Sequence, residues 1–232
     1  MFRITTACAL ALASSAVAAP VFTTSDQLTP NSSDRIEARF RADTTNWDTR
    51  LEFDSFPNNG DTTGNDANSR SKHEGGPYAY AMSFDSTTAA VSFTITRPDT
   101  TTSVLTQAVS GFDQLNSIQL FTSGSRGSVT MTALDFTGLG MDTNAFPNID
   151  SQPNALGGPQ FAETWLHFGN TFDLLSGDWS LTGNVHFDDF TRNNPSEGAK
   201  MTVKLRDTTI PAPASLALLG TAGLAATRRR RA

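Results

Sequence analysis

The feature that most constrains the fold of this chain is a period-two alternation of apolar and polar residues. It occurs in RIEARF (35–40), TRLEFDSF (49–56), YAYAMSFD (78–85) and AVSFTIT (90–96). Because successive side chains of a β-strand point to opposite faces, the pattern predicts strands with one buried face. The residues expected on that face are Ile36, Ala38, Phe40, Leu51, Phe53, Tyr78, Tyr80, Met82, Phe84, Val91, Phe93 and Ile95.

The rest of the body continues this pattern and contains no long helical pattern. SVTMTALDF (128–136) places Val129, Met131 and Ala133 in phase, and 57–77 and 142–160 are expected to be polar loops. About nine to eleven short strands are expected. Parallel strands need crossovers of about a dozen residues, so an antiparallel arrangement is predicted. The prediction is an all-β fold over residues 19–209, a two-sheet sandwich with a jelly-roll-like or Greek-key path.

Charge separates the body of the chain from its ends. The sequence has 17 Lys and Arg and 23 Asp and Glu, for a net charge of −6. Arg3 and Arg228 to Arg231 lie at the ends, and all acidic residues lie between them. The body therefore has 12 basic and 23 acidic residues, a net charge of −11. Such a body argues against nucleic acid as a partner, because phosphate contacts need Lys and Arg. We interpret the charge as keeping an exported protein soluble.

The N-terminal segment has the features of a secretory signal peptide. Arg3 precedes an apolar stretch from about Ala7 to Ala13, and Ala16 to Ala18 match the A-x-A cleavage pattern. We expect residues 1–18 to direct the chain to the Sec translocon. Signal peptidase is expected to cut between Ala18 and Ala19.

The C-terminal segment, IPAPASLALLGTAGLAATRRRRA, has three parts in order. Ile210, Pro211, Ala212 and Pro213 are expected to be extended, because proline fixes φ and disfavours helix at the residue before it. The apolar stretch 214–227 predicts a short helix of about 21 Å, less than the ~30 Å hydrocarbon core of a bilayer. Snorkelling arginines and local thinning of the bilayer compensate for part of the difference. The cluster Arg228, Arg229, Arg230 and Arg231 is expected on the cytoplasmic side.

This order of parts resembles the PEP-CTERM sorting signal of Gram-negative and related bacteria. That signal comprises a Val-Pro-Glu-Pro-like motif, a short apolar helix and a terminal Arg-rich cluster. The resemblance implies cleavage near the motif by an exosortase, a membrane cysteine transpeptidase, and a link to exopolysaccharide and biofilm matrix. Ala212 stands where the family usually has Glu. The body, including DWSLTGNVHFDDF, is similar to the choice-of-anchor ectodomains found ahead of such signals, which implies a β-rich exported domain.

Three tryptophans are candidate glycan contacts: Trp47, Trp165 and Trp179. Exposed aromatic rings stack on the CH faces of sugars while polar neighbours bond to the hydroxyls, and Trp47 and Trp179 have such neighbours. The alternative, which we favour, is that these large side chains belong to the core.

No arrangement typical of catalysis is recognisable in the sequence. The glutamates form no pair on one strand such as E-x-D-x-x-E, and adjacent aspartates point to opposite faces of a strand. The histidines lack metal-binding spacings, so we interpret them as satisfied or solvent-facing, and no G-x-S-x-G or P-loop occurs. The residues considered are Glu37, Glu52, Glu74, Glu163, Glu197, Asp188, Asp189, His73, His167 and His186.

Cofactors are not expected. The only cysteine, Cys8, lies in the signal segment, so the body has no disulfide, thiolate zinc site or cysteine nucleophile. In the loop 57–77, oxygen ligands for calcium are available, but their spacing does not fit an EF-hand. We therefore favour solvated turns. The oxygen ligands considered there are Asp61, Asp66, Asn68 and Glu74.

These features predict a non-enzymatic protein of the cell surface or extracellular matrix, transiently held in the inner membrane by residues 210–232. Its expected partners are the export machinery, an exosortase-like transpeptidase and exopolysaccharide. The alternatives are a carbohydrate-binding module that uses the tryptophans, and a polysaccharide hydrolase or lyase.

Overall fold

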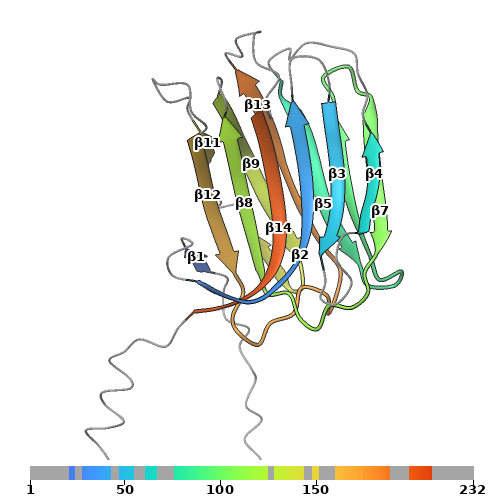
Figure 1. Cartoon of the computed structure of the whole chain (residues 1–232), viewed down its shortest axis with the longest axis vertical. Coiled ribbons are helices and arrows are strands. Elements are labelled where there is room, and N and C mark those ends of the chain that lie inside the picture. The colour runs from blue at the N-terminus through green and yellow to red at the C-terminus, as the bar shows by residue number, and fades with distance from the viewer. Residues whose placement is uncertain are drawn as a thin grey trace, which may run out of the picture.

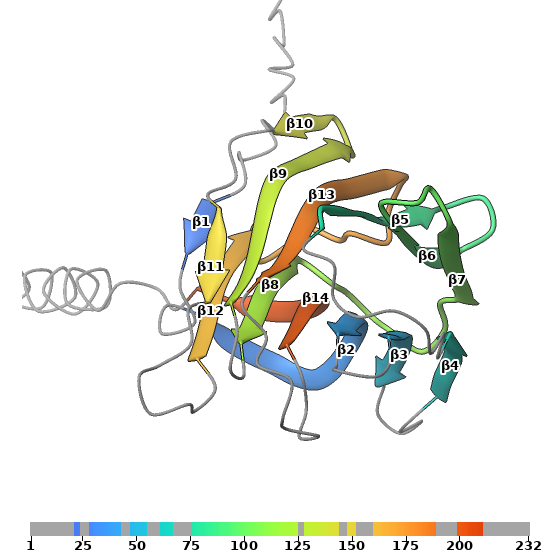
Figure 2. The same cartoon turned by 90° about the horizontal axis from the view of Figure 1, so that it is seen from above.

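The structure is a computed structural model that describes residues 21–23, 28–42, 47–54, 61–66, 76–124, 128–143, 148–151, 160–188 and 199–210. Within these ranges the chain forms fourteen β-strands and no helix. The strands make two antiparallel sheets that pack face to face (Figures 1 and 2). The predicted all-β fold of two antiparallel sheets is therefore confirmed. The expected signal peptide and C-terminal helix lie outside the described residues.

Each sheet contains seven strands. In sheet A the order is β1 (Val21–Thr23), β12 (Gln160–His167), β8 (Ser117–Gly124), β14 (Ala199–Thr209), β2 (Thr29–Ala42), β3 (Trp47–Asp54) and β4 (Asp61–Asp66). In sheet B it is β10 (Met141–Thr143), β9 (Ser128–Gly138), β13 (Trp179–Asp188), β5 (Tyr78–Asp85), β6 (Ala90–Thr96) and β7 (Thr102–Ala108), with β11 (Ile149–Ser151) paired to β9. Beyond β7, strands β8, β12 and β14 join sheet A, whereas β9 and β13 join sheet B.

The apolar residues of the alternating segments fill the layer between the sheets. Ile36, Ala38 and Phe40 of β2 are fully buried, as the pattern predicted. Phe40 in sheet A contacts two aromatic rings of sheet B edge-on. Its ring centroid lies 5.6 Å from that of Tyr78 and 5.5 Å from that of Phe187. These contacts join the sheets, since each buried aromatic side chain contributes about 1.5–3 kcal/mol through burial.

Strands also form where polar loops were expected. β4 lies within 57–77, β11 lies within 142–160, and β10 overlaps the first two residues of that second range. All three pair with one neighbour only, β4 with β3 and the other two with β9. At such edges the backbone of the neighbouring strand supplies the hydrogen bonds, so an alternating apolar pattern is not required. The loop prediction was wrong for these three segments.

A β-bulge in β9 reverses the expected phase of its side chains. Thr132 pairs with Asn184 and Asp135 with Thr182, so Ala133 and Leu134 together lie opposite a single β13 residue. Ala133 has a positive φ of 51° and is exposed. Leu134 is buried in its place. The prediction that Ala133 faces the core was wrong, because the extra residue shifts the alternation by one.

The residue opposite this bulge, Gly183, makes room for Tyr80. A Cβ at Gly183 would lie 2.8 Å from Tyr80 Oη, so the ring packs directly on the glycine backbone. The Tyr80 hydroxyl is buried and has no hydrogen-bond partner in the described structure. Burial also raises the pKa of this phenol, so the hydroxyl stays protonated.

Replacing Tyr80 by Phe is expected to stabilise the protein by about 1–2 kcal/mol. The substitution removes a buried hydroxyl that lost its bonds to water on folding without regaining one. Urea denaturation of the wild type and Tyr80→Phe would measure the difference. A loss of stability would show that the hydroxyl has a partner, such as a buried water.

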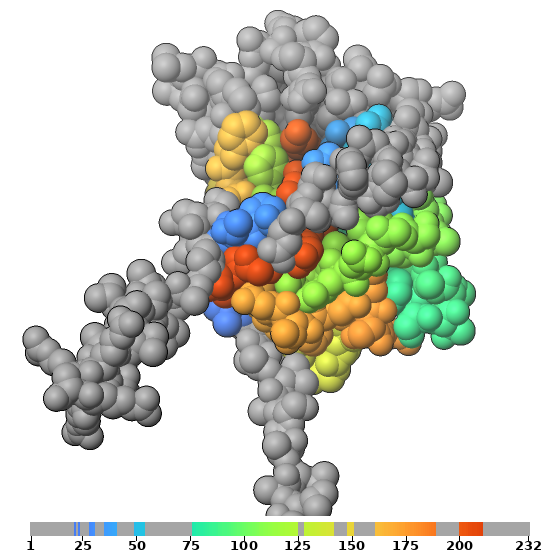
Figure 3. Space-filling view, turned by 60° about the horizontal axis from the view of Figure 1, so that its bottom comes forward, coloured from blue at the N-terminus to red at the C-terminus, as the bar shows by residue number. Residues whose placement is uncertain are grey.

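The sandwich begins with β1 and finishes with β14 at the same end, which we call the terminal pole. Val21 of β1 pairs with His167 at the end of β12. Thr29, the first residue of β2, pairs with Thr209 at the end of β14. Figure 3 shows the red end of β14 against blue N-terminal residues, with the orange segment 168–178 beside them. Residues 1–20 and 211–232 are therefore joined to the sandwich at the same pole.

Candidate functional site

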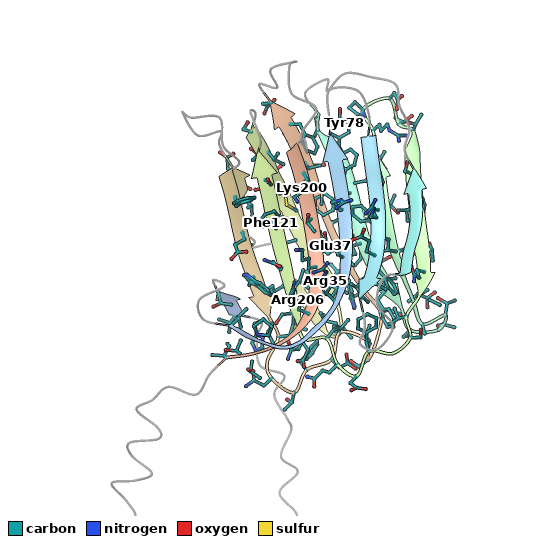
Figure 4. The ribbon with its side chains drawn as sticks, in the orientation of Figure 1. Arg35, Glu37, Tyr78, Phe121, Lys200 and Arg206 are labelled. Atoms are coloured by element: carbon teal, nitrogen blue, oxygen red, sulfur yellow. The ribbon has the colours of Figure 1, made fainter. Side chains whose placement is uncertain are left out.

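The outer faces of the two sheets differ in chemistry. On sheet B, a typical row across β13, β5, β6 and β7 reads Thr182, Ala81, Thr94 and Val104. On sheet A, rows across β8, β14, β2 and β3 contain mostly charged residues (Figure 4). Three of these rows are Ser117–Arg206–Arg35–Asp54, Gln119–Lys204–Glu37–Glu52 and Phe121–Thr202–Arg39–Arg50.

Six basic side chains on β14, β2 and β3 define what we call the cationic face. They come from segments that are up to 171 residues apart in the sequence. Antiparallel pairing of β14 with β2 brings them together on one face. Among the described residues outside this sheet face, Arg97 is the only Lys or Arg. The cationic face comprises Arg35, Arg39, Arg50, Lys200, Lys204 and Arg206.

Glu37 lies within the cationic face and pairs with two of its members. Its Oε2 is 3.3 Å from Lys204 Nζ and 3.4 Å from Arg35 Nε. Burial lowers the pKa of Lys204; Glu37 opposes this shift, whereas repulsion from Arg206 and Arg35 adds to it. Positive charge is therefore dense enough on this face that neighbouring cations repel one another.

An aromatic pair, Phe121 of β8 and Phe161 of β12, adjoins the cationic face. The rings are stacked with centroids 5.4 Å apart, and Phe161 is 61% exposed. Lys204 Nζ lies 5.8 Å from the Phe121 ring centroid, within cation–π range. Beside the pair, Gln119 Nε2 donates to Glu163 Oε2 at 2.7 Å. Sequence reasoning considered tryptophans only and missed this pair, although Phe161 shares the alternation of Glu163 and Trp165.

The structure places the candidate tryptophans differently. Trp179 is 3% exposed, stacks on Phe136 in the core, and donates its indole N–H to Leu174 O at 2.7 Å. Trp165 lies on the outer face of sheet A beside Gln119 but is only 5% exposed. Neither indole presents a ring face to solvent, so these two tryptophans have a packing role rather than the glycan contact considered as a candidate from the sequence. The side chain of Trp47 lies outside the described residues.

The candidate carboxylates do not all come together. Glu37, Glu52 and Glu163 share the outer face of sheet A, where each has a basic or amide partner. Asp188 is exposed at the end of β13 in sheet B. Glu74, Asp189 and Glu197 lie outside the described residues.

His167 belongs to a buried polar cluster at the terminal pole, which we call the polar clasp. Its Nδ1 is 2.8 Å from Ser117 Oγ, and its Nε2 is 3.1 Å from Asn170 Oδ1. The Asn116 side chain donates to Thr208 O and accepts from Thr208 N, both at 2.9 Å. Ser117 is fully buried, so a substrate has no access to a Ser–His pair here. The clasp ties β8 and β12 to the end of β14, which agrees with the expectation of a satisfied histidine.

The polar clasp is expected to weaken as pH falls below about 6.5. Burial lowers the pKa of His167, while the bond to Asn170 and the charge of Asp207 oppose the shift. In the unfolded chain this imidazole takes up a proton near pH 6.5, before the folded one does. The stabilisation from this group is therefore fully present above about pH 6.5 and is lost as the pH falls toward the pKa of the folded state. Its size is about 1.4 kcal/mol for each unit by which folding lowers the pKa of His167.

Unfolding free energies measured in urea between about pH 7.5 and pH 5.5 would test this. His167→Gln is expected to flatten the decrease, whereas His186→Gln, on the outer face of sheet B, should leave it in place. An unchanged slope in His167→Gln would show that another group is responsible. His73 lies outside the described residues.

Within the described ranges, no group of three or more His, Cys, Asp or Glu side chains is arranged to hold a metal ion. The described ranges also contain no helix long and apolar enough to span a bilayer. Asp61 and Asp66 lie in β4 with undescribed side chains, and Asn68 lies outside the described residues, so the calcium interpretation stays a sequence hypothesis.

Comparison with known proteins adds no family to this picture. No protein-family model matches the chain, and no curated protein matches it either. The fold and the site therefore define an antiparallel two-sheet protein with one cationic outer face, and its function is argued from that surface and from the chain ends.

Proposed function

We propose that this chain is an exported, non-enzymatic protein of the cell surface or matrix, sorted by an exosortase-type system and associated with exopolysaccharide. The Sec translocon and signal peptidase would act on residues 1–18, and the transpeptidase near residues 210–213. A jelly-roll-like path is part of this proposal, supported by the alternation of the later strands between the two sheets.

The observation that carries the proposal is that Val21 and Ile210, the first and last described residues, both lie at the terminal pole. There β1 pairs with the end of β12, and β14 ends beside the start of β2. A sandwich held through residues 210–232 at this pole keeps the outer faces of both sheets free of the tether. The polar clasp supports this reading, because Asn170 Oδ1 also accepts from Ile210 N at 3.2 Å, where the sorting segment begins.

Cell fractionation and intact mass of the released protein would test the proposal. We expect loss of residues 1–18 and a C-terminus near Pro213, with the protein at the surface or in the matrix. Replacing Arg228 to Arg231 by Ala should abolish the C-terminal cut, whereas Arg97→Ala, a basic residue of a turn, should not. A released chain that retains Arg231 would contradict transpeptidase sorting.

A carbohydrate-binding module is the second candidate, now favoured by the aromatic pair rather than by the tryptophans. Phe161 is exposed beside a Gln–Glu hydrogen bond, an arrangement that suits ring stacking with polar contacts at its edge. Loss of binding to the host exopolysaccharide in Phe161→Ala would support this candidate. Turnover of that polymer, abolished by Glu163→Gln, would replace both proposals with an enzyme.

A further inference from the structure

We propose that the cationic face is a binding site for an acidic polysaccharide. Carboxylate or sulfate groups of the polymer pair with Lys and Arg side chains of β14, β2 and β3, and a sugar ring packs on Phe161. The inference rests on the proposed function in one respect, namely that the protein meets such a polymer outside the cell.

The cationic face locally reverses the negative charge of the body. Its described side chains on β14, β2 and β3 are six basic residues together with Glu37 and Glu52, a net charge of +4. The body as a whole carries −11, so the remainder carries −15. A polyanion is attracted to this face and repelled by the rest of the body.

The basic residues of the cationic face form a two-dimensional array. Basic residues recur on three adjacent strands about 4.8 Å apart and at alternate positions about 6.7 Å apart along a strand. This two-dimensional array suits a chain of repeated anionic groups better than one small anion. Side chains of Arg35, Arg50 and Lys204 are 32%, 28% and 20% exposed, so they are already held by packing. Such pre-ordering reduces the entropy lost on binding.

The aromatic pair, Phe121 and Phe161, lies at the edge of this array. Phe161 offers an exposed ring in line with Lys200, because both pair with Ser123 from opposite sides. A polymer that crosses the strands would therefore meet cations first and a stacking surface next. Glu163 and Gln119, bonded to each other, lie one and two rows further along the same face and offer groups for sugar hydroxyls.

The surrounding negative charge favours a narrow polymer over a membrane or a nucleic-acid duplex. Unscreened interactions reach about 8–10 Å at physiological ionic strength. A bilayer or a duplex presents phosphates over a width that extends past the face toward the acidic remainder. A single polysaccharide chain that stays on this sheet face, from β3 and β2 across β14 and β8 to Phe161, avoids most of that repulsion.

The full 232-residue chain, purified in mild detergent, would be tested against polygalacturonate, dextran sulfate and neutral dextran. Binding to polygalacturonate, dextran sulfate or both is expected, and it should weaken as salt increases. Lys200→Gln/Lys204→Gln is expected to lose roughly thirtyfold in affinity, since each of the two cations near an anionic surface contributes on the order of 1 kcal/mol. Thr102→Glu/Thr137→Glu changes the net charge equally on sheet B and should bind nearly as the wild type does.

Glu37→Gln supplies a test with the opposite sign. It removes the carboxylate at the centre of the cationic face and is expected to tighten binding by about threefold. A variant that merely unfolds would not bind better. Phe161→Ala should weaken binding to both anionic polymers without changing the salt dependence.

Three results would overturn the inference. These are no binding of the folded wild type to either anionic polymer, equal binding to neutral dextran, and stronger binding to phosphatidylglycerol vesicles or duplex DNA. Surface localisation is measured separately in cells with the same variants. If Lys200→Gln/Lys204→Gln binds normally while sorting is intact, the inference fails alone; if the chain is never exported, the proposed function fails.

Discussion

Gly138→Ala is expected to destabilise the protein by about 3–5 kcal/mol, a large part of the ~5–15 kcal/mol that holds a typical domain together. Gly138 ends β9 with a φ of 119°. A Cβ there would overlap Asp178 O and lie 2.5 Å from Trp179 Cα. Both are backbone atoms of the paired segment, so no side-chain rotation relieves the overlap. The left-handed φ adds about 1–2 kcal/mol for a residue with a side chain.

Gly140→Ala is the matched control, two residues further along the same turn. Gly140 also has a left-handed φ, 75°, but a Cβ there would have no atom within 4 Å. This variant should lose only about 1–2 kcal/mol from the backbone conformation. Urea denaturation of both variants would separate the effect of overlap from that of φ. Equal losses would contradict the close approach of Gly138 to β13.

Phe40→Ala is the second substitution with a large expected effect, a loss of about 3–5 kcal/mol. The ring is fully buried and contacts Tyr78 and Phe187 across the sandwich. Truncation removes both edge-on contacts and leaves a cavity between the sheets, which relaxes only in part. Thermal and urea unfolding would measure the change.

Two further variants bracket this effect. Phe40→Leu retains most of the volume and should cost less than about 1.5 kcal/mol. Val104→Ala, on an exposed position of β7, should stay within about 0.5 kcal/mol of the wild type. A small loss in Phe40→Ala would mean that the sheets are not held together at this point.

The candidate binding surface shows why an average charge is a poor guide to partners. From the sequence, the acidic body argued against nucleic acid as a partner, on the assumption that its charge is evenly spread. Pairing of β14 with β2 instead brings Lys200, Lys204 and Arg206 next to Arg35 and Arg39. These residues occur in RIEARF and AKMTVKLR, where each is one polar position of an alternating strand. Their common face follows from the pairing of two distant segments.

The sequence by itself determined the fold class and most of the core. Ile36, Phe40, Tyr78 and Met82 are buried where the period-two pattern placed them, because strand geometry fixes which face each side chain occupies.

Only the tertiary structure decided the features that depend on which strands are neighbours. The bulge at Ala133 depends on its pairing with β13, and the edge strands form because a neighbour supplies backbone hydrogen bonds. The same holds for the polar clasp, in which His167 meets Ser117 and Thr208. Local alternation sets inward and outward along one strand, but pairing between distant strands sets which outward residues share a surface, and that is a property of the whole chain.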